Sequence, residues 1–441
     1  MSNTLMPNRA ADSMKLACIA DDFTGATDLA NNLVRAGMRV VQTIGVPPGV
    51  SHIDADAVVV ALKSRTSPAA EAVAESLEAL RWLLSLAPAD TPPQVYFKYC
   101  STFDSTAQGN IGPVSEALMA ALACPLTIAT PAFPDNGRAV FKGHLFVGDA
   151  LLSESGMQHH PLTPMTDPNL VRVLQSQCTR PVGLVEYRTV LAGAQAIRQR
   201  LDALRTAGVG HAIVDAVTNE DLMRIGEAVA ELPLVTAGSG LAIGLPPRWG
   251  FAPNEHAARL PAVHGRRAIV SGSCSLATNQ QVRAFIDAGG AALAIDPLRH
   301  AEGHDVVGES LAWAREHMAR TPVLIYSTAE ADAVKAVQQR LGVQHAGEMT
   351  ERCLAAIACG LVDLGVGQLI VAGGETSGAC VQALGIQSMQ IGPQIDPGVP
   401  WCHAHSTVAP GGLHIALKSG NFGAADFFTK AFEMLAAAPT R

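Results

Sequence analysis

The chain has 441 residues, of which 48% are hydrophobic and 16% are charged, and its formal net charge is −8. This length exceeds what one typical core accommodates, so two domains are expected. The acidic balance excludes a basic face for nucleic acid, although a locally positive pocket can still bind a small anion.

The sequence also bears on membrane insertion, secretion and the state of the cysteines. No apolar run approaches the roughly 20 residues that span a bilayer, and the start, "MSNTLMPNRAADSMK", lacks the apolar stretch of a secretory signal. The nine cysteines include no CxxC pair, which favours free thiols over a zinc site or a disulfide framework. We therefore expect a cytoplasmic protein without a membrane partner, in which residues 1–14 form a flexible leader.

Short runs of Val, Ile, Leu and Ala alternate with Ala-rich helical patterns in the first part of the chain. The strand candidates, in order, are "LACIA", "RVVQTIG", "DAVVVAL", "QVYFKYC", "LTIAT", "VGLVEY", "HAIVDA" and "LPLVTAG". Helical patterns such as "ATDLANNLVRAG" and "SPAAEAVAESLEALRWLLSLA" separate them. Continuous apolar strands separated by helices indicate a parallel sheet covered on both faces. Residues 15–250 are therefore expected to form an α/β domain of the doubly wound type.

The alternation stops at "GLPPRWGFAPNEHAARLPAVHGRR", whose prolines and mixed polar residues follow no period. This stretch predicts a linker over residues 251–266. The alternation resumes with "RAIVSGS", "AALAID", "PVLIYST", "QLIVAGGETS", "IQSMQIG" and "HIALKSGNFG". A second α/β domain is therefore expected over residues 267–441, with the ligand site in the cleft between the two domains.

Ligands of open parallel sheets bind beyond the carboxyl ends of the strands. After the first predicted strand, "ADDFTGATD" places Asp21 and Asp22 before a helix that opens with Thr24 and Gly25. Asp and Thr at such a position cap helices, but two adjacent carboxylates exceed what one cap needs. At least one of them is a candidate to bind substrate hydroxyls, magnesium or a proton in transfer.

Two later strand ends add cations and donors. "KSRTS" contains Lys63 and Arg65, which as surface cations need no function, although Arg65 at a strand end suits a carboxylate clamp. The connection "FKYCSTFDSTAQGNIG" contains Lys98, Ser101, Thr102, Asp104, Ser105, Gly109 and Asn110. Ordinary turns share this composition, but the helix start at Gly112 offers amides that suit an anion.

Glycines follow three strands of the second part, in "VSGSCS" (270–275), "AGGETSGA" (372–379) and "KSGNFG" (418–423). One glycine after a strand indicates only a tight turn. Three such loops with hydroxyl or amide donors indicate a phosphate cradle. Glu375 would repel phosphate, and a metal ion or ribose hydroxyls would reconcile its presence.

The common nucleotide-binding motifs and metal-ligand patterns are absent from the sequence. The chain has no G-x-x-x-x-G-K-[ST], and neither "GGETSG" nor "GSGLAIG" matches G-x-G-x-x-G, so a Walker P-loop is excluded and a dehydrogenase is weakly supported. His159, His160 and the "HAH" at 403–405 lack matching carboxylates and are interpreted as surface histidines. No metal-ligand set is predicted.

Seven motifs together resemble the four-carbon acid sugar kinases, from about residue 16 to residue 428. They are "IADDFTGATD", "KSRTS", "KYCSTFDSTAQGNIGP", "PAFPDNGRAV", "SGSCSLATNQQV", "GGETSGA" and "LKSGNFG". "KYCSTFDST" and "HLFVGDALLSESGMQHHPLTPMTDPNLVRVLQ" are similar to the branch that acts on 3-oxo acids. The threonate and erythronate kinases of the family carry a shorter, lysine-richer loop.

The resemblance implies an acid-sugar-binding domain followed by an ATP-binding domain. It also implies phosphorylation of the 4-hydroxyl of 3-dehydrotetronate by ATP, with Mg²⁺ accompanying the nucleotide. The implied acid-sugar contacts are Asp21, Asp22, Arg65, Lys98, Asp104, Ser105 and Asn110. The implied ATP contacts are Ser271, Ser273, Gly373, Gly374, Glu375, Thr376, Ser377, Gly378, Gly420 and Asn421.

Phosphoryl transfer depends mainly on positioning and charge neutralisation, yet the attacking hydroxyl must also lose a proton. The candidate catalytic residues are Asp22, Asp21 and Lys98. Adjacent strand-end side chains point in different directions, so one carboxylate is expected to face the hydroxyl while the other caps the helix or orders a cation. Asp22, further beyond the strand, is the favoured proton acceptor.

Two alternatives stay open at this point. One is a sister kinase that acts on threonate or erythronate, and the other is a nucleotide- and acid-binding protein without turnover. The density of Asp21, Asp22, Lys98 and Asp104 argues against the second, since binding alone needs fewer polar groups. The sequence leaves the oligomeric state open, including a homo-oligomer.

Overall fold

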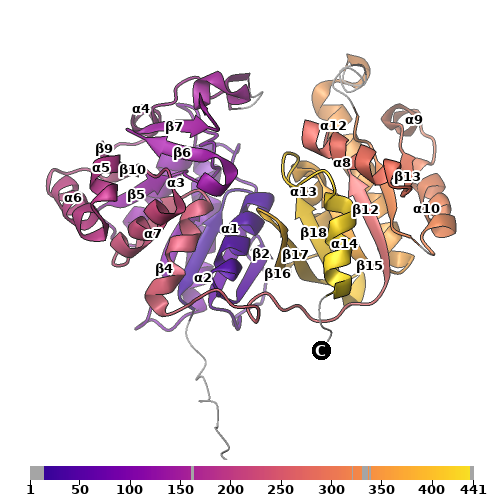
Figure 1. Ribbon diagram of the computed structural model, residues 1–441, viewed down its shortest axis with the longest axis horizontal. Coiled ribbons are helices and arrows are strands. Elements are labelled where there is room, and N and C mark those ends of the chain that lie inside the picture. The colour runs from indigo at the N-terminus through magenta and orange to yellow at the C-terminus, as the bar shows by residue number, and fades with distance from the viewer. Residues whose placement is uncertain (1–13, 160–162, 320, 330–335, 337–338, 438–441) are drawn as a thin grey trace, which may run out of the picture. The chain divides into compact units, whose positions relative to one another are not determined.

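The computed structural model describes residues 14–159, 163–319, 321–329, 336 and 339–437 (Figure 1). The chain divides into two compact units that are not two consecutive segments. Unit 1 holds the chain up to Ala20, together with Met38–Val41 and Val46–Ala252. Unit 2 holds Asp21–Gly37, Gln42–Gly45 and the chain from Pro253 onward.

Unit 1 is built on a parallel sheet with strand order β3-β1-β4-β11-β5-β10-β9. These strands are β3 (Ala57–Ala61), β1 (Leu16–Ala20), β4 (Gln94–Lys98), β11 (Leu234–Ala237), β5 (Thr127–Thr130), β10 (His211–Val214) and β9 (Val182–Val185). Every residue of β1, β3 and β4 is buried, as expected for parallel strands covered on both faces. Strand β2 (Val40–Ile44) is divided between the units after Val41.

Helices and a small second sheet complete unit 1. Its α-helices are α2 (Ala69–Ser85), α3 (Ile111–Ala121), α4 (Leu170–Gln175), α5 (Tyr187–Leu191), α6 (Ala194–Thr206) and α7 (Asn219–Ala228). The antiparallel sheet, which the sequence did not predict, contains β6 (Arg138–Phe141), β7 (His144–Val147) and β8 (Ala150–Leu151). Short 3₁₀ helices are η1 (Pro134–Asn136), η2 (Leu152–Glu154), η3 (Gly156–His159), η4 (Gly240–Gly244) and η5 (Pro246–Trp249).

Unit 2 contains a mixed sheet with strand order β13-β14-β12-β15-β18-β17-β16. Its strands are β13 (Ala291–Ala294), β14 (Val323–Tyr326), β12 (Arg266–Ser271), β15 (Val366–Ala372), β18 (Ala409–Lys418), β17 (Val399–Ser406) and β16 (Ser388–Asp396). The strands from β13 to β18 in this order are parallel. Strands β16, β17 and β18 pair antiparallel, so the expected alternation of strand and helix gives way to a meander there. Two largely parallel α/β sheets flanked by helices confirm the predicted fold class.

The helices of unit 2 come from both ends of the chain. They are α1 (Phe23–Arg35), α8 (Leu276–Asp287), α9 (Pro297–Ala301), α10 (Val306–His317), α12 (Val343–Asp363), α13 (Gly374–Ala383) and α14 (Phe427–Ala437). Helix α1 packs against β16, β17 and α13, and Asn31 donates a hydrogen bond of 2.6 Å to the Gln394 side chain. The helix that follows the first strand of unit 1 is therefore part of unit 2.

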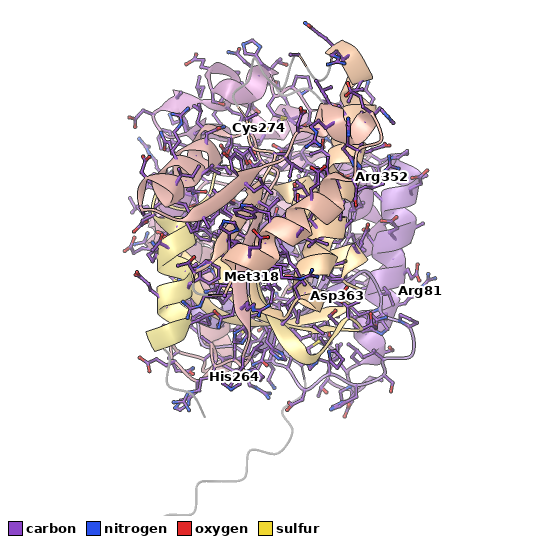
Figure 2. All side chains as sticks on the ribbon, turned by 90° about the vertical axis from the view of Figure 1, so that its right-hand side faces the viewer. Arg81, His264, Cys274, Met318, Arg352 and Asp363 are labelled. Atoms are coloured by element: carbon purple, nitrogen blue, oxygen red, sulfur yellow. The ribbon has the colours of Figure 1, made fainter. Side chains whose placement is uncertain are left out.

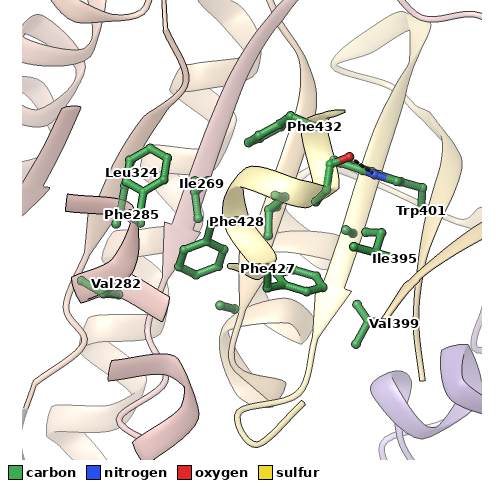
Figure 3. Close-up of a cluster of buried hydrophobic side chains, with 14 residues drawn as sticks. Ile269, Val282, Phe285, Leu324, Ile395, Val399, Trp401, Phe427, Phe428 and Phe432 are labelled. Carbon is green, nitrogen blue, oxygen red and sulfur yellow. Dashed lines mark hydrogen bonds between the residues drawn. The ribbon is translucent and has the colours of Figure 1, made fainter. Parts of the chain in front are cut away.

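A buried aromatic cluster joins α14 to the sheet of unit 2 (Figure 3). Phe427, Phe428 and Phe432 of α14 are at most 2% exposed. The Trp401 indole N–H donates to the Ala431 carbonyl at 2.8 Å, which satisfies the polar atom of a fully buried side chain. Burial of each large apolar side chain contributes about 1.5–3 kcal/mol, so this cluster anchors the last helix on the strands that carry the glycine loops. Among the described helices, none is long and apolar enough to cross a membrane.

Candidate active site

Asp22 is the N-cap of α1. Its Oδ1 accepts a 2.6 Å hydrogen bond from the Gly25 amide, and its Oδ2 accepts one of 3.2 Å from the Thr24 hydroxyl. Asp21, the preceding residue, is 4% exposed. The capping role that the sequence allowed for one of the two carboxylates thus belongs to Asp22, which the sequence analysis favoured as the proton acceptor.

A charged cluster forms beyond the carboxyl ends of β3 and β4 in unit 1. Arg65 lies 3.9 Å from Asp104, measured from Nη1 to Oδ2, and the Thr102 hydroxyl donates to Asp104 at 2.6 Å. Lys98, the last residue of β4, is only 3% exposed. The pKa of the nearby Cys100 thiol is raised to about 11 by burial and by Asp104, and Arg65 and Lys98 oppose this rise. The structure therefore brings three of the predicted acid-sugar contacts around one thiol.

Asn110 and Ser105 are bound to protein groups next to this cluster. The Asn110 side-chain amide donates to the carbonyls of Ser64 at 2.7 Å and Ser67 at 3.1 Å, so it holds the loop that carries Arg65. The Ser105 hydroxyl accepts a 2.8 Å hydrogen bond from Gln177. Both residues thus take part in hydrogen bonds that join the loops.

One of the amides at the start of α3, where the sequence suggested an anion site, is bonded to a side chain. The Gly112 amide donates to Gln177 Oε1 at 2.9 Å, and the amide group of the same glutamine donates to the Ser105 hydroxyl. Sequence reasoning missed Gln177, since a glutamine in "LQSQC" carries no local signal. The first-turn amide is therefore committed to the loop after α4.

The three glycine-bearing strand ends of unit 2 converge, as the sequence predicts. The amides of Gly272 and Ser273 donate to the Ala372 carbonyl at 2.9 and 3.2 Å. The Gly373 amide donates to the carbonyl of Lys418 at 2.8 Å. Parallel strands place their carboxyl ends at one edge, and these hydrogen bonds tie the loops after β12, β15 and β18 into one framework.

The predicted glycine loop at 373–378 is mostly helix. Helix α13 begins at Gly374, and its N-cap Gly373 has φ of 125°, which side chains larger than hydrogen rarely tolerate. A Cβ atom on Gly374 would meet nothing within 4 Å, so open space adjoins the first amides of the helix. Ser377 is fully buried, and its hydroxyl has no hydrogen-bond partner among the described residues. The first amides of a helix form a ready site for phosphate.

Three other predicted ATP contacts differ from one another in exposure and in what they contact. Ser271 is fully buried and hydrogen-bonded to the Thr328 hydroxyl at 2.6 Å. A Cβ atom on Gly378 would lie 3.1 Å from the Phe23 ring, so this glycine permits close packing of α1. Asn421 is exposed, as is Cys274 in the loop after β12 (Figure 2).

Lys418 organises the loop after β18, and sequence reasoning missed it as a site residue. The side chain is fully buried, and its Nζ donates to Thr278 Oγ1 at 2.9 Å. It also donates to the carbonyls of Ser419 and Gly420, each at 3.0 Å. Gly420 accepts two more hydrogen bonds, from the hydroxyls of Ser275 at 2.5 Å and Thr278 at 2.9 Å. The buried amino group of Lys418 thus fixes the course of this loop.

Burial lowers the pKa of Lys418 from 10.5 to about 7, which predicts a pH dependence of stability. Between pH 7 and 10.5 the unfolded chain holds a proton on this amine that the folded chain has released. Folding then becomes more favourable as the pH rises, by about 1.4 kcal/mol per pH unit at most. The free energies of unfolding of the wild type and of Lys418→Met can be measured in urea at pH 7 and pH 9.5. The difference between them should change in favour of the wild type at the higher pH. Exposed Lys142→Met serves as the control, and a pH-independent difference for Lys418→Met would contradict the prediction.

Of the histidines interpreted as surface residues, His159 and His405 are exposed, whereas His403 is buried. His403 lies on strand β17 and is 5% exposed, with its ring 5.9 Å from that of the buried His414 on β18. Burial is the main cause that lowers the pKa of His403 to about 4, with His405 and His414 adding to it. His403, the first residue of the "HAH" motif, therefore lies in the interior of the meander. His160 lies outside the described residues.

Comparisons with known proteins agree with this arrangement. Residues 16–245 match the sugar-binding N-terminal domain family, and residues 268–428 match the nucleotide-binding C-terminal domain family. A 3-oxo-tetronate kinase from Burkholderia multivorans is 58% identical over 95% of this chain and 97% of its own length. The enzyme of the same name from Cupriavidus necator is also 58% identical, over 95% of this chain and 97% of its own.

Solved structures show the same architecture. A protein from Salmonella typhimurium LT2 matches with a TM-score of 0.85 at 43% identity, over 95% of this chain and 98% of the other. A Haemophilus influenzae protein matches with a TM-score of 0.80 at 43% identity, over 95% of this chain and 100% of the other. Identities at this level across nearly the whole chain confirm the resemblance seen in the sequence motifs. The chain belongs to the four-carbon acid sugar kinase family, and the 3-oxo-tetronate kinases are among its relatives there.

Proposed function

We propose that this chain is an ATP-dependent kinase that phosphorylates the 4-hydroxyl of a four-carbon 3-oxo acid, 3-dehydrotetronate, in the cytoplasm. The observation that carries the proposal is the framework of three glycine-bearing strand ends in unit 2, which leaves the helix start at Gly374 open. The names of relatives that are 58% identical supply the substrate class.

The residues at the start of α13 fit a nucleotide phosphate. Oxygen atoms of a phosphate chain suit the amides of the first turn and the open space beside Gly374. They also suit the buried hydroxyl of Ser377, which has no hydrogen-bond partner in the described part of the chain. Ser273 and Gly420 lie in the loops that hydrogen bonds join to this helix start. Glu375, exposed in the same turn, offers a carboxylate to Mg²⁺, which prefers oxygen ligands and neutralises phosphate charge when bound.

The charged cluster of unit 1 fits an acid sugar. Arg65 presents a planar fork that matches a carboxylate, and Lys98 supplies a second positive charge from a buried position. Asp104 keeps a carboxylate beside Arg65, so it can accept hydrogen bonds from substrate hydroxyls. Asn110 and Ser105 serve this cluster by holding the loops that bear it.

The transfer step needs a proton acceptor for the 4-hydroxyl, and we assign Asp21 to this role. Asp22 is engaged by two hydrogen bonds of the α1 cap. The hydroxyl oxygen forms a bond to the γ-phosphorus while the bond from that phosphorus to the bridging oxygen of ADP breaks. The hydroxyl proton passes to the carboxylate, and ADP leaves.

Coupled measurement of ADP release tests the proposal directly. The purified chain with ATP and Mg²⁺ should turn over 3-dehydrotetronate with a kcat/KM at least tenfold above those for threonate and erythronate. Preference for threonate or erythronate would make it a sister kinase. Binding of ATP and the acid without ADP release would identify a binding protein.

Arg65→Lys should raise the KM for the acid sugar by about tenfold or more while it changes the KM for ATP little. Lysine keeps the positive charge but loses the two-pronged geometry that binds a carboxylate. Steady-state kinetics with each substrate varied in turn would measure both constants. Arg198→Lys, which alters an exposed ion pair with Glu227, is the control. A larger effect on ATP would assign Arg65 to the phosphate instead.

A further inference from the structure

Three side chains with metal-binding atoms meet in unit 1, away from the charged cluster. Glu116 of α3, Cys178 after α4 and His211 of β10 place one ligand atom each within 4.8 Å of the others. His211 is the first residue of its strand and is aligned with Thr127 and Val182, the first residues of β5 and β9. The group therefore lies at the amino-terminal edge of the sheet, whereas Lys98 ends β4 at the carboxyl edge.

His211 is an unusual residue for the interior. It is fully buried, and neither ring nitrogen has a hydrogen-bond partner among the described residues. A buried polar group without a partner costs about 1–3 kcal/mol, and native proteins avoid most such losses. A cation bound between His211, Cys178 and Glu116 would give one of these nitrogens a partner.

Glu116 is held in place by the segment that carries the thiol. Its Oε1 accepts hydrogen bonds from the amides of Thr179 at 2.8 Å and Arg180 at 3.0 Å. The Thr179 hydroxyl adds a 2.8 Å hydrogen bond to Oε2. A carboxylate has about four lone-pair positions, so Oε2 retains capacity for a metal. These hydrogen bonds fix the carboxylate next to Cys178 without help from an ion.

We propose that Glu116, Cys178 and His211 bind one divalent transition-metal ion of the Zn²⁺ class. A thiolate, an imidazole and a carboxylate are the donors that Zn²⁺ accepts, and three protein ligands leave a fourth tetrahedral position for water. Ligand atoms at ordinary zinc distances lie about 3.3–3.6 Å apart. Side-chain rotations that move the three ligand atoms by about 1 Å would bring them to this spacing. The Cys178 S–H bond breaks as sulfur bonds to the metal, and the proton passes to solvent.

A cavity opens beside the carboxylate. Glu116 borders a cavity of about 290 Å³, whose lining also includes Cys124 and Arg180. Glu116 and Cys178 are both half-buried, so these two ligands are partly accessible to solvent while the imidazole is buried. The cavity also supplies a matched control, because Cys124 lines it without belonging to the trio.

Metal titration of the full-length protein tests the site. After treatment with a chelator and its removal, Zn²⁺ binding is measured by competition with a chromophoric chelator, and proton release is followed in weak buffer. We expect one ion per chain and one proton per ion, with Co²⁺ giving the absorption band of a cobalt–thiolate bond. Cys178→Ser and Glu116→Gln should each weaken binding by at least tenfold, and Cys178→Ser should abolish the band.

The control variant Cys124→Ser should keep the affinity, the proton release and the cobalt band of the wild type. Circular dichroism establishes that each variant is folded, and half-buried Cys178 tolerates serine, which differs by one atom. The proposal is wrong if Cys178→Ser binds Zn²⁺ as tightly as the wild type, or if Cys124→Ser loses as much affinity as Cys178→Ser. It is also wrong if the wild type binds no Zn²⁺ up to about 1 mM.

Discussion

Asp21→Asn should lower kcat by about 10²–10⁴-fold, the usual contribution of a positioned proton acceptor, while ATP binding stays nearly intact. Asparagine keeps the shape of the side chain but cannot take the proton from the 4-hydroxyl. The assignment depends on the cap of α1, in which both oxygens of Asp22 accept hydrogen bonds. Rapid-quench measurement of phosphoryl transfer would separate this step from product release.

Asp22→Asn is the matched control for this experiment. Asparagine caps helices about as well as aspartate, so α1 should keep its start and kcat should fall by less than tenfold. If Asp22→Asn abolishes turnover while Asp21→Asn does not, the roles are reversed, and Asp22 is the acceptor despite its cap. If neither change affects kcat, the acceptor lies elsewhere, and Asp104 is the next candidate.

Gly374→Val should reduce ATP affinity by well over tenfold, a loss that needs only about 1.4 kcal/mol. A Cβ atom at Gly374 meets no protein atom within 4 Å, so the fold should accept the valine. The branched side chain would then occupy the space that the proposed nucleotide needs beside the first amides of α13. Calorimetric titration with a non-hydrolysable ATP analogue measures the change.

Gly411→Val provides the comparison for the glycine substitution. A Cβ atom there also meets nothing within 4 Å, but Gly411 lies on β18 away from the strand's carboxyl end. Its ATP affinity should equal that of the wild type. Equal binding by folded Gly374→Val would remove the start of α13 from the nucleotide site.

The sequence was most informative where a local pattern has a fixed spatial meaning. A continuous apolar strand such as "LIVA" before Gly373 predicts a buried parallel strand, and parallel strands bring their following loops to one edge. Convergence of the loops after β12, β15 and β18 follows from that rule alone. The resemblance of the motifs added the substrate class, which no period or spacing contains.

Other features depend on contacts between distant residues and leave no local trace. From the sequence, Lys418 is a cation at a strand end, of the kind usually found in solvent. In the structure it is buried and donates a hydrogen bond to the Gly420 carbonyl. Gln177 gains its role only because the loop after α4 reaches Ser105 and Gly112. Hydrophobic periodicity says that a helix has a buried face, but not which part of the chain covers it.

The assignment of α1 to unit 2 bears on how separable the two halves are. A gene cut at residues 251–266 would leave Phe23–Arg35 on the amino-terminal fragment, while β16, β17 and α13, against which this helix packs, would go to the other. Apolar side chains of α1 that pack against these elements would face water in the first fragment. The carboxy-terminal fragment would expose the surface that receives them. Nucleotide-binding halves therefore cannot be exchanged among relatives as independent modules unless the helix travels with them.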